Sequence, residues 1–116
     1  MDFENKQRII QEFVPGKQVT LAHIVARPDK ELYSKLGVMK EAEDAVGILT
    51  ITPSEGAIIA ADVAIKTASV SLVFVDRFSG SLMVSGDVVS VRAALEAIIT
   101  TLENKLRFTP SEITET

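Results

Sequence analysis

The sequence predicts a two-layer α+β protein in which helices cover one face of an antiparallel sheet. Four runs rich in β-branched and other apolar residues, at 17–26, 46–51, 70–75 and 81–85, have the length and composition of strands. Three helical segments alternate with them. No low-complexity tract or linker divides the 116 residues, so residues 1–116 are expected to form a single domain.

The stretch from Gly47 to Asp87 organises the chain. The strand at 46–51 is followed by Thr52-Pro53-Ser54-Glu55, which has the spacing of a capping box with proline at the first helical position. A helix is therefore predicted from Pro53 to about Ala68. A hairpin of strands 70–75 and 81–85 follows, and Gly80 supplies the positive φ that its turn needs.

The flanking elements follow from similar signals. Lys17 to Ala26 reads as a strand, and Pro28 can start a short helix that ends at Gly37. Residues 38–44 form a charged loop. Asp87 is a good N-cap for the clearest helical stripe of the sequence, made by Val88, Val91, Leu95, Ile98, Leu102 and Leu106. The tail can add a short edge strand at 112–114.

The N-terminal residues 2–14 allow three interpretations: a helix, a short strand or a frayed terminal arm. Phe3, Ile9, Ile10, Phe13 and Val14 have the spacing of a weak amphipathic helix, but 8–14 could equally be a short strand. Pro15-Gly16 separates this arm from the main fold. Its large apolar side chains indicate that something covers it.

Composition excludes several functions. Twelve basic and sixteen acidic residues give a net charge of −4, which argues against a nucleic-acid-binding face. The chain lacks cysteine, so thiolate metal sites and nucleophiles are excluded. The N-terminus lacks the apolar core of a signal peptide, and no apolar run reaches the roughly 20 residues of a membrane span. A soluble protein is expected.

The residues show no convincing chemistry. His23 is the only histidine and is expected to be a hydrogen-bonded structural residue of its strand. Asp62 and Lys66 have the spacing of a helical ion pair. Asp76-Arg77 are expected to be solvated turn charges, and Glu41, Glu43 and Asp44 a solvated loop. No catalytic residue, metal or cofactor is proposed, and the protein is predicted not to be an enzyme.

Several segments together resemble the bacterial microcompartment shell proteins of the hexameric class. They are Gly47-Ile48-Leu49 with Thr52-Pro53, Ala61-Asp62-x-x-x-Lys66, Ala68-x-Val70-x-Leu72-x-Phe74, Ser79-Gly80, and Ser85-Gly86-Asp87-Val88-x-x-Val91-x-x-Ala94. In standard members this block opens the chain, and a segment resembling 23–28 closes it. Here that segment comes first. The chain therefore resembles the circularly permuted subclass, which includes minor shell proteins of ethanolamine- and propanediol-utilisation compartments, and the match covers residues 8–114.

The resemblance implies a homohexamer that tiles with other shell proteins in the bacterial cytoplasm, on a ferredoxin-like core. It implies that Lys66 lies at the hexamer edge with Arg27 and Pro28. The turn Arg77, Phe78, Ser79 and Gly80 would line the sixfold pore. The first residues, among them Ile9, Ile10, Gln11 and Phe13, would form one strand of a six-stranded barrel over the pore. Asp44 and Asp29 depart from residues found in other members, which bears on hexamer shape and edge contacts.

A second function, from a different class, shares the same architecture. Small-molecule-sensing domains of the ferredoxin-like, ACT-like kind are also two-layer sandwiches, and fold does not fix function. Oligomeric state separates the two, since a shell protein forms hexamers and sheets and a sensing domain forms a ligand-stabilised dimer or tetramer. A cargo targeting peptide is a further candidate partner. The sequence does not choose between ethanolamine, propanediol and choline pathways.

Overall fold

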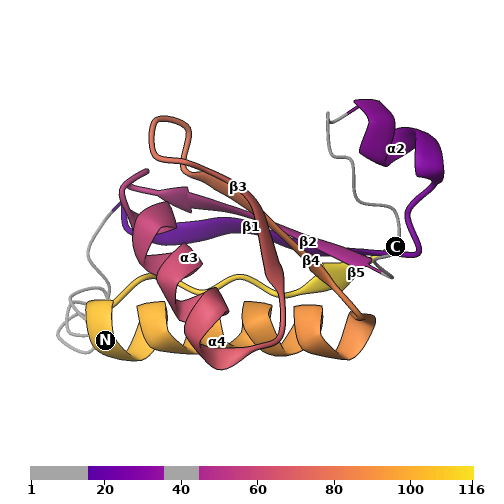
Figure 1. The fold of residues 1–116 in the computed structure, drawn as a ribbon. Coiled ribbons are helices and arrows are strands. Elements are labelled where there is room, and N and C mark those ends of the chain that lie inside the picture. Colours follow the sequence, from indigo (N-terminus) through magenta and orange to yellow (C-terminus); the bar gives the residue numbers. More distant parts are fainter. Residues whose placement is uncertain (1–15, 36–44) are drawn as a thin grey trace, which may run out of the picture.

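The structure is a computed structural model that describes residues 16–35 and 45–116 (Figure 1). Its elements run in the order β1 (Gln18–Ala26), α2 (Lys30–Lys35), β2 (Ala45–Thr52), α3 (Gly56–Thr67), β3 (Ser71–Asp76), β4 (Ser81–Gly86), α4 (Val88–Leu106) and β5 (Thr114–Glu115). The N-terminal arm and the predicted loop at 38–44 lie outside the described residues.

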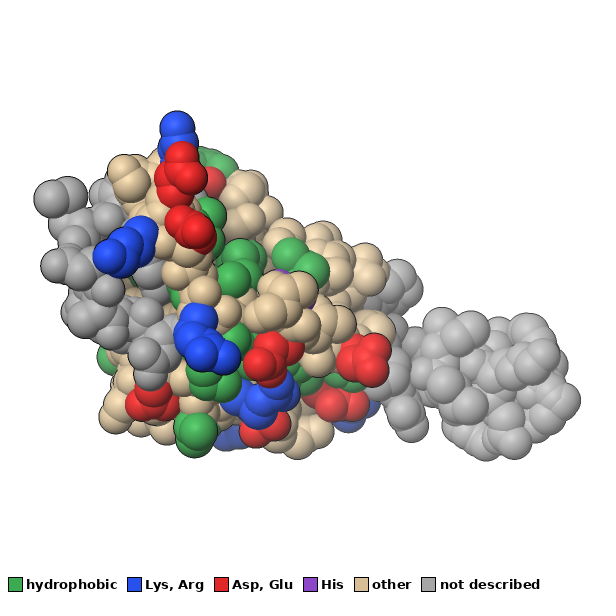
Figure 2. Space-filling model, turned by 90° about the vertical axis from the view of Figure 1, so that its right-hand side faces the viewer, with side chains coloured by type: hydrophobic (Ala, Val, Ile, Leu, Met, Phe, Trp, Pro, Cys, Tyr) green, Lys and Arg blue, Asp and Glu red, His purple; other side chains and the backbone are tan. Residues whose placement is uncertain are grey.

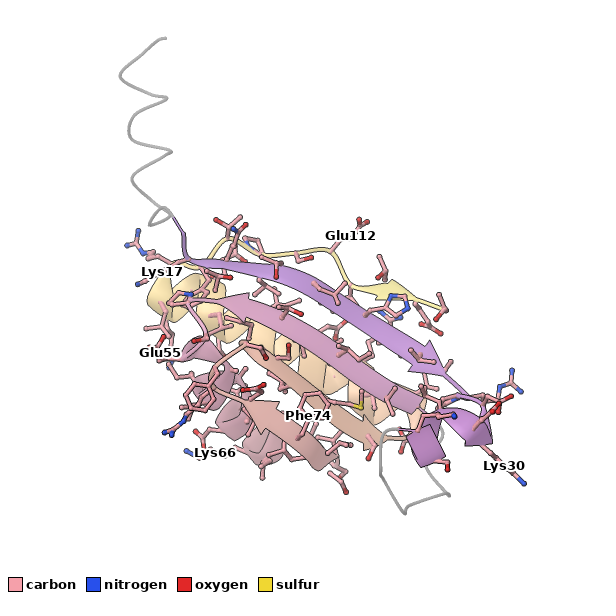
Figure 3. The ribbon with its side chains drawn as sticks, turned by 90° about the horizontal axis from the view of Figure 1, so that it is seen from above. Lys17, Lys30, Glu55, Lys66, Phe74 and Glu112 are labelled. Atoms are coloured by element: carbon pink, nitrogen blue, oxygen red, sulfur yellow. The ribbon has the colours of Figure 1, made fainter. Side chains whose placement is uncertain are left out.

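The strands form one five-stranded sheet in the order β3-β4-β2-β1-β5. The four longer strands pair antiparallel, as predicted, and β5 pairs parallel to β1. Seen from above in Figure 3, β3 and β5 lie at opposite edges of the sheet. The register places Gln18 opposite Thr52, and Ser81 opposite both Thr50 and Asp76, so one end of the sheet carries the start of β1 and the β3–β4 turn.

Helices α3 and α4 cover one face of this sheet and pack against each other (Figure 1). The core lies between these layers. Its fully buried large side chains include Ile24, Leu49, Ile51, Leu82, Leu95, Ile98 and Leu102. Gly47 lets α4 approach closely, because a Cβ at this position would lie 2.7 Å from Leu95 Cδ1 and 2.8 Å from Val91 Cγ1. On the opposite face, Val46 and Met83 form a smaller buried cluster.

The predicted long helix is confirmed at both its cap and its stripe. The Asp87 carboxylate accepts a hydrogen bond of 2.7 Å from the Ser90 amide. The predicted stripe faces the sheet: Val91, Leu95, Ile98 and Leu102 are buried, and Val88 and Leu106 pack against them. The helix ends at Arg107, whose left-handed backbone (φ 64°) is typical of a helix C-terminus.

The predicted start of the preceding helix is wrong. α3 begins at Gly56, and Glu55 precedes it without a side-chain capping bond. Thr52 instead belongs to β2, where it pairs with Gln18. Its peptide bond to Pro53 is cis. Residues 53–55 form a turn, in which the carbonyl of Pro53 accepts from the Gly56 amide at 2.9 Å. The four residues that have the capping-box spacing therefore form the end of β2 and a turn, and not the start of a helix.

Two peripheral elements also differ from expectation. The short helix is α2, which begins at Lys30 after the Asp29 carboxylate accepts from the Glu31 amide. It makes no close backbone contact with another described element and lies apart from α3 and α4, so the helices do not all share one face (Figure 1). The expected edge strand at 112–114 is β5, shifted to Thr114–Glu115.

Candidate assembly surfaces

The β3–β4 turn is held by hydrogen bonds to the side chain of Asp76. The Asp76 carboxylate accepts hydrogen bonds from the amides of Phe78 (2.9 Å) and Ser79 (3.3 Å). The pKa of Asp76 lies below its ordinary value of 3.8. The main cause is the bond from the Phe78 amide, and the hydroxyl and amide of Ser79 add to it. Asp76 is therefore a cap of the turn, and the expectation of a merely solvated charge was wrong.

Gly80 closes the turn and ties it to the sheet. It has the predicted positive φ, 80°. Its amide donates to the Asp76 carbonyl and its carbonyl accepts from the Ile51 amide, both at 2.9 Å. A Cβ here would lie 2.2 Å from the Ile51 carbonyl oxygen, which leaves room only for glycine. The turn is thus bonded at its start through Asp76 and joined to β2 at its end through Gly80.

The tip of this turn presents an aromatic ring to solvent. Phe78 is 81% exposed, and the Arg77 guanidinium lies over its ring at 4.8 Å from the centroid. Beside it is an open hollow of about 470 Å³ that Ile58, Phe74, Val75, Asp76, Arg77 and Phe78 line. The sequence does not reveal this hollow, because Ile58 comes from α3 and the other lining residues come from β3 and its turn.

Lys66 lies near the end of α3, where its ammonium pairs with Asp62 at 2.9 Å. Both side chains are exposed, so the predicted helical ion pair exists and contributes little stability by itself. Arg27 and Pro28 follow β1, and Arg27 has a positive φ of 51°. Figure 3 shows Lys66 on the β3 side of the sheet and Lys30, which follows this segment, at the far end of β1. The structure therefore does not bring the predicted edge residues together within one subunit.

His23 is the structural histidine that the sequence predicts. Its Nδ1 lies 2.5 Å from the Thr114 hydroxyl and its Nε2 lies 2.9 Å from the Thr116 hydroxyl. The histidine thereby fastens the C-terminal tail to β1. Arg92 on α4 adds an ion pair with Glu115 of the same tail, which sequence reasoning did not find.

A metal-binding cluster is absent from the described part of the chain. No group of three His, Asp or Glu side chains within it could hold a metal ion. None of the described helices is long and apolar enough to cross a membrane. In Figure 2, acidic and basic side chains are intermixed on the face shown and do not form a basic stripe.

The BMC domain profile matches residues 45–113, from β2 to the C-terminal tail. The chain belongs to the BMC family. It is 52% identical to the bacterial microcompartment shell protein PduU of Salmonella typhimurium, over 94% of this chain and 93% of that protein. It is also 52% identical to the shell protein EutS of the same organism, over 96% and 98% of the two chains.

A solved structure of the family agrees with this fold. The flat hexamer of CutR superimposes with a TM-score of 0.83 and 50% identity, over 94% of this chain and 99% of that chain. The resemblance to hexameric BMC shell proteins is therefore confirmed.

Proposed function

We propose that this protein is a structural subunit of a bacterial microcompartment shell and assembles into a hexameric tile. The observation that carries the proposal is the similarity to CutR, because 50% identity over nearly the whole of both chains extends to a protein solved as a flat hexamer. The small-molecule-sensing alternative has no comparable support. An enzymatic role is not part of the proposal, since its named relatives are shell proteins.

Circular permutation of the family fold is the second part of the proposal. The BMC profile begins at residue 45, so β1 precedes the matched region. Yet β1 is an interior strand, paired with β2 on one side and β5 on the other. In a circularly permuted chain, a strand of the family sheet comes before the block that the profile matches, and β1 has this position. The whole chain then acts as one domain.

We place the turn Arg77–Gly80 at the sixfold axis and the N-terminal arm over it. The register supports this placement, because the start of β1 and the turn lie at the same end of the sheet. An arm that precedes Gly16 therefore starts at the same end of the sheet as the turn, with β2 between β1 and the hairpin. Six arms, each with Ile9, Ile10, Gln11 and Phe13, would close a barrel without free edges and restrict the pore. These arm residues lie outside the described part of the chain.

The proposed partners are five further copies of the chain and other shell proteins, with a cargo targeting peptide as an additional candidate. The proposed location is the compartment shell in the bacterial cytoplasm. Near-equal identity to PduU, EutS and CutR leaves the pathway among propanediol, ethanolamine and choline utilisation. Lys66, Arg27 and Pro28 are proposed to form the hexamer edge, where Lys66 meets a neighbouring tile.

Lys66→Asp tests the tile directly. We expect the variant to remain a hexamer of six 12.5 kDa subunits but to lose sheets and tubes, because like charges would meet at each tile boundary. Lys105→Asp is the matched control, since Lys105 is also exposed and lies in the last turn of α4. Light scattering measures the hexamer and electron microscopy the sheets. Normal tiling of Lys66→Asp would remove Lys66 from the edge, and a wild-type dimer would refute the hexameric tile.

A further inference from the structure

The C-terminal tail, residues 109–116, covers the outer edge of β1 with very little regular strand (Figure 3). At one end of β1, the Val19 amide donates a hydrogen bond of 2.9 Å to the Thr109 carbonyl. At the other end, the Thr116 amide donates one of 2.9 Å to the Ile24 carbonyl. Between these contacts, β5 is only two residues long. The tail is therefore attached to β1 mainly near its two ends.

Side chains from both faces of the sheet hold the far end of this tail. His23 lies on the face without α4, because the next residue of β1 packs in the core under that helix. Its two ring nitrogens meet the hydroxyls of Thr114 and Thr116, at 2.5 and 2.9 Å. On the helical face, the Arg92 guanidinium pairs with the Glu115 carboxylate. The alternating side chains of the tail are thus bound by β1 on one face and by α4 on the other.

These fasteners are polar, and apolar packing adds little to them. Of the tail's side chains, only Ile113 packs against the described core, and it is only partly buried. Thr114, Glu115 and Thr116 are exposed. A segment that buries so little apolar surface can open locally while the rest of the fold stays intact. The tail therefore has the properties of a detachable unit.

The strand beneath the tail would be a hazardous edge if it were bare. β1, Gln18–Ala26, has nine residues and contains no proline, aspartate, glutamate, lysine or arginine. Long uncharged edge strands pair readily with other chains, and proteins protect such edges with charges, proline or a covering segment. The tail covers β1 and brings Pro110, Glu112 and Glu115 to the outside of the sheet. It replaces an edge suited to pairing with one that is not.

We propose that the tail is a detachable guard of the β1 edge, fastened by His23 and Arg92, and that an opened subunit pairs this edge with β1 of a second copy. Two identical strands can pair antiparallel about a twofold axis, which makes the contact self-complementary. Nine residues give an edge of about 30 Å, enough for a continuous ladder. The inference does not depend on the hexameric tile, since it concerns one subunit and the contact that its closed tail prevents.

Hydrogen exchange of the full-length protein tests whether the tail is detachable. The Thr116 amide and the Ala26 amide, which donates to the Thr116 carbonyl, should exchange together. Both should exchange at least about tenfold faster than the amide of Ile98 in the middle of α4, because tail opening leaves the core closed. Exchange of all three amides at one rate would show that the tail opens only with the whole fold, which overturns the proposal.

A charge reversal tests the fastener on the helical face. In Arg92→Glu, two carboxylates face each other, so exchange at Thr116 should become about two- to fivefold faster, as expected for an exposed ion pair. The combined variant Arg92→Glu with Glu115→Arg restores opposite charges and should return to the wild-type rate. An unchanged rate in Arg92→Glu, or no recovery in the combined variant, would remove Arg92 from the clasp.

Light scattering over a range of concentrations tests what the closed tail prevents. Thr116→Pro removes both the amide that donates to Ile24 and the hydroxyl that meets His23, whereas Thr116→Ser keeps both and is the control. Thr116→Pro combined with Arg92→Glu should form particles of at least twice the wild-type mass, and the Ala26 amide, fast at low concentration, should regain protection in them.

Three results would overturn this part of the proposal. They are an unchanged mass although Ala26 exchanges fast, larger particles in which Ala26 stays unprotected, and particles smaller than those of the wild type. The last would show that the tail joins copies and does not keep them apart. The mass of the wild-type protein in the same experiment tests the hexameric tile separately, so the two failures are distinguishable.

Discussion

At the residue scale, two residues set the conformation of the β3–β4 turn, Gly80 and Asp76, and only the role of Gly80 could be predicted from the sequence. Gly80 was predictable, because a serine-glycine pair between two strands indicates a positive φ. The role of Asp76 was not predicted, since the sequence alone does not show whether its carboxylate bonds to the turn amides or is only solvated. Its carboxylate accepts two amides, which makes it the group that orders the tip carrying Arg77 and Phe78.

Asp76→Ala should therefore loosen the turn without unfolding the subunit. Amide hydrogen exchange at Phe78 and Ser79 should become several-fold faster, because both N–H groups lose their acceptor. Asp62→Ala, which removes an exposed carboxylate from α3, should leave these amides unchanged. Unchanged exchange in Asp76→Ala would show that Gly80 alone sets the turn.

The same contact predicts a pH dependence of the turn in the wild-type protein. The folded state lowers the pKa of Asp76, so its stabilising contribution is complete above the ordinary value of 3.8. It is lost as the pH falls below that value through the lowered pKa. Turn order measured by nuclear magnetic resonance should be constant from neutral pH to about 4 and decline only in stronger acid. A transition near neutral pH would contradict this assignment.

At the element scale, strongly periodic or β-branched segments were predictable and locally ambiguous ones were not. Helix α4 buries one face, and the spacing of its apolar residues shows which face that is. The four long strands could be recognised by their β-branched and apolar composition, although β3 has no buried side chain and β4 buries consecutive ones. The start of α3 was mispredicted because Thr52 fits both a cap and a strand end, and only pairing with Gln18 decides between them. β5 was displaced because its two residues depend on contacts with β1.

The assembly surfaces illustrate the same limit. The turn at 77–80 and Lys66 could be proposed as assembly residues only because a family resemblance implies roles for residues that otherwise look like ordinary surface charge. The hollow beside the turn could not, since Ile58 and Val75 are distant in sequence and meet only when α3 packs beside β3. A periodic pattern shows which face an element buries, but it does not show which exposed faces adjoin.

The α4 stripe predicts a graded response to truncation. Ile98→Ala should lower the free energy of unfolding by about 2–5 kcal/mol, because it opens a cavity between the helix and the sheet. Val89→Ala, at a 79% exposed position of the same helix, should change it by less than about 0.5 kcal/mol. Denaturant titration at one protein concentration measures both, and equal effects would place the stripe on the wrong side of the helix.

At the scale of the whole molecule, the candidate contact residues lie on different parts of the subunit surface. One end of the sheet carries the turn and the entry of the N-terminal arm, and the helical layer carries Lys66 on its outer face. A subunit organised in this way can contact an axis, a ring neighbour and a neighbouring tile with separate surfaces. Ring closure and tiling should therefore respond to different substitutions.

The position of the core indicates whether the hexamer needs the barrel or the barrel needs the hexamer. All of the described core, from Val19 to Phe108, is outside residues 1–13. A single short arm cannot maintain a strand in water, since even a two-stranded hairpin is marginal. Six arms brought together by the ring can pair, so the barrel should depend on the hexamer and the hexamer should not depend on the barrel.

Deletion of residues 1–13 should accordingly leave a folded hexamer that has six-subunit mass and keeps the circular dichroism signal of its helices. In the full-length hexamer, the amides of Ile9 to Phe13 should be protected from hydrogen exchange. The deletion should also make an Arg77→Cys thiol at the proposed axis react faster than in the full-length chain. Unprotected arm amides would rule out the barrel, whereas collapse of the truncated protein to monomers would reverse the order of dependence.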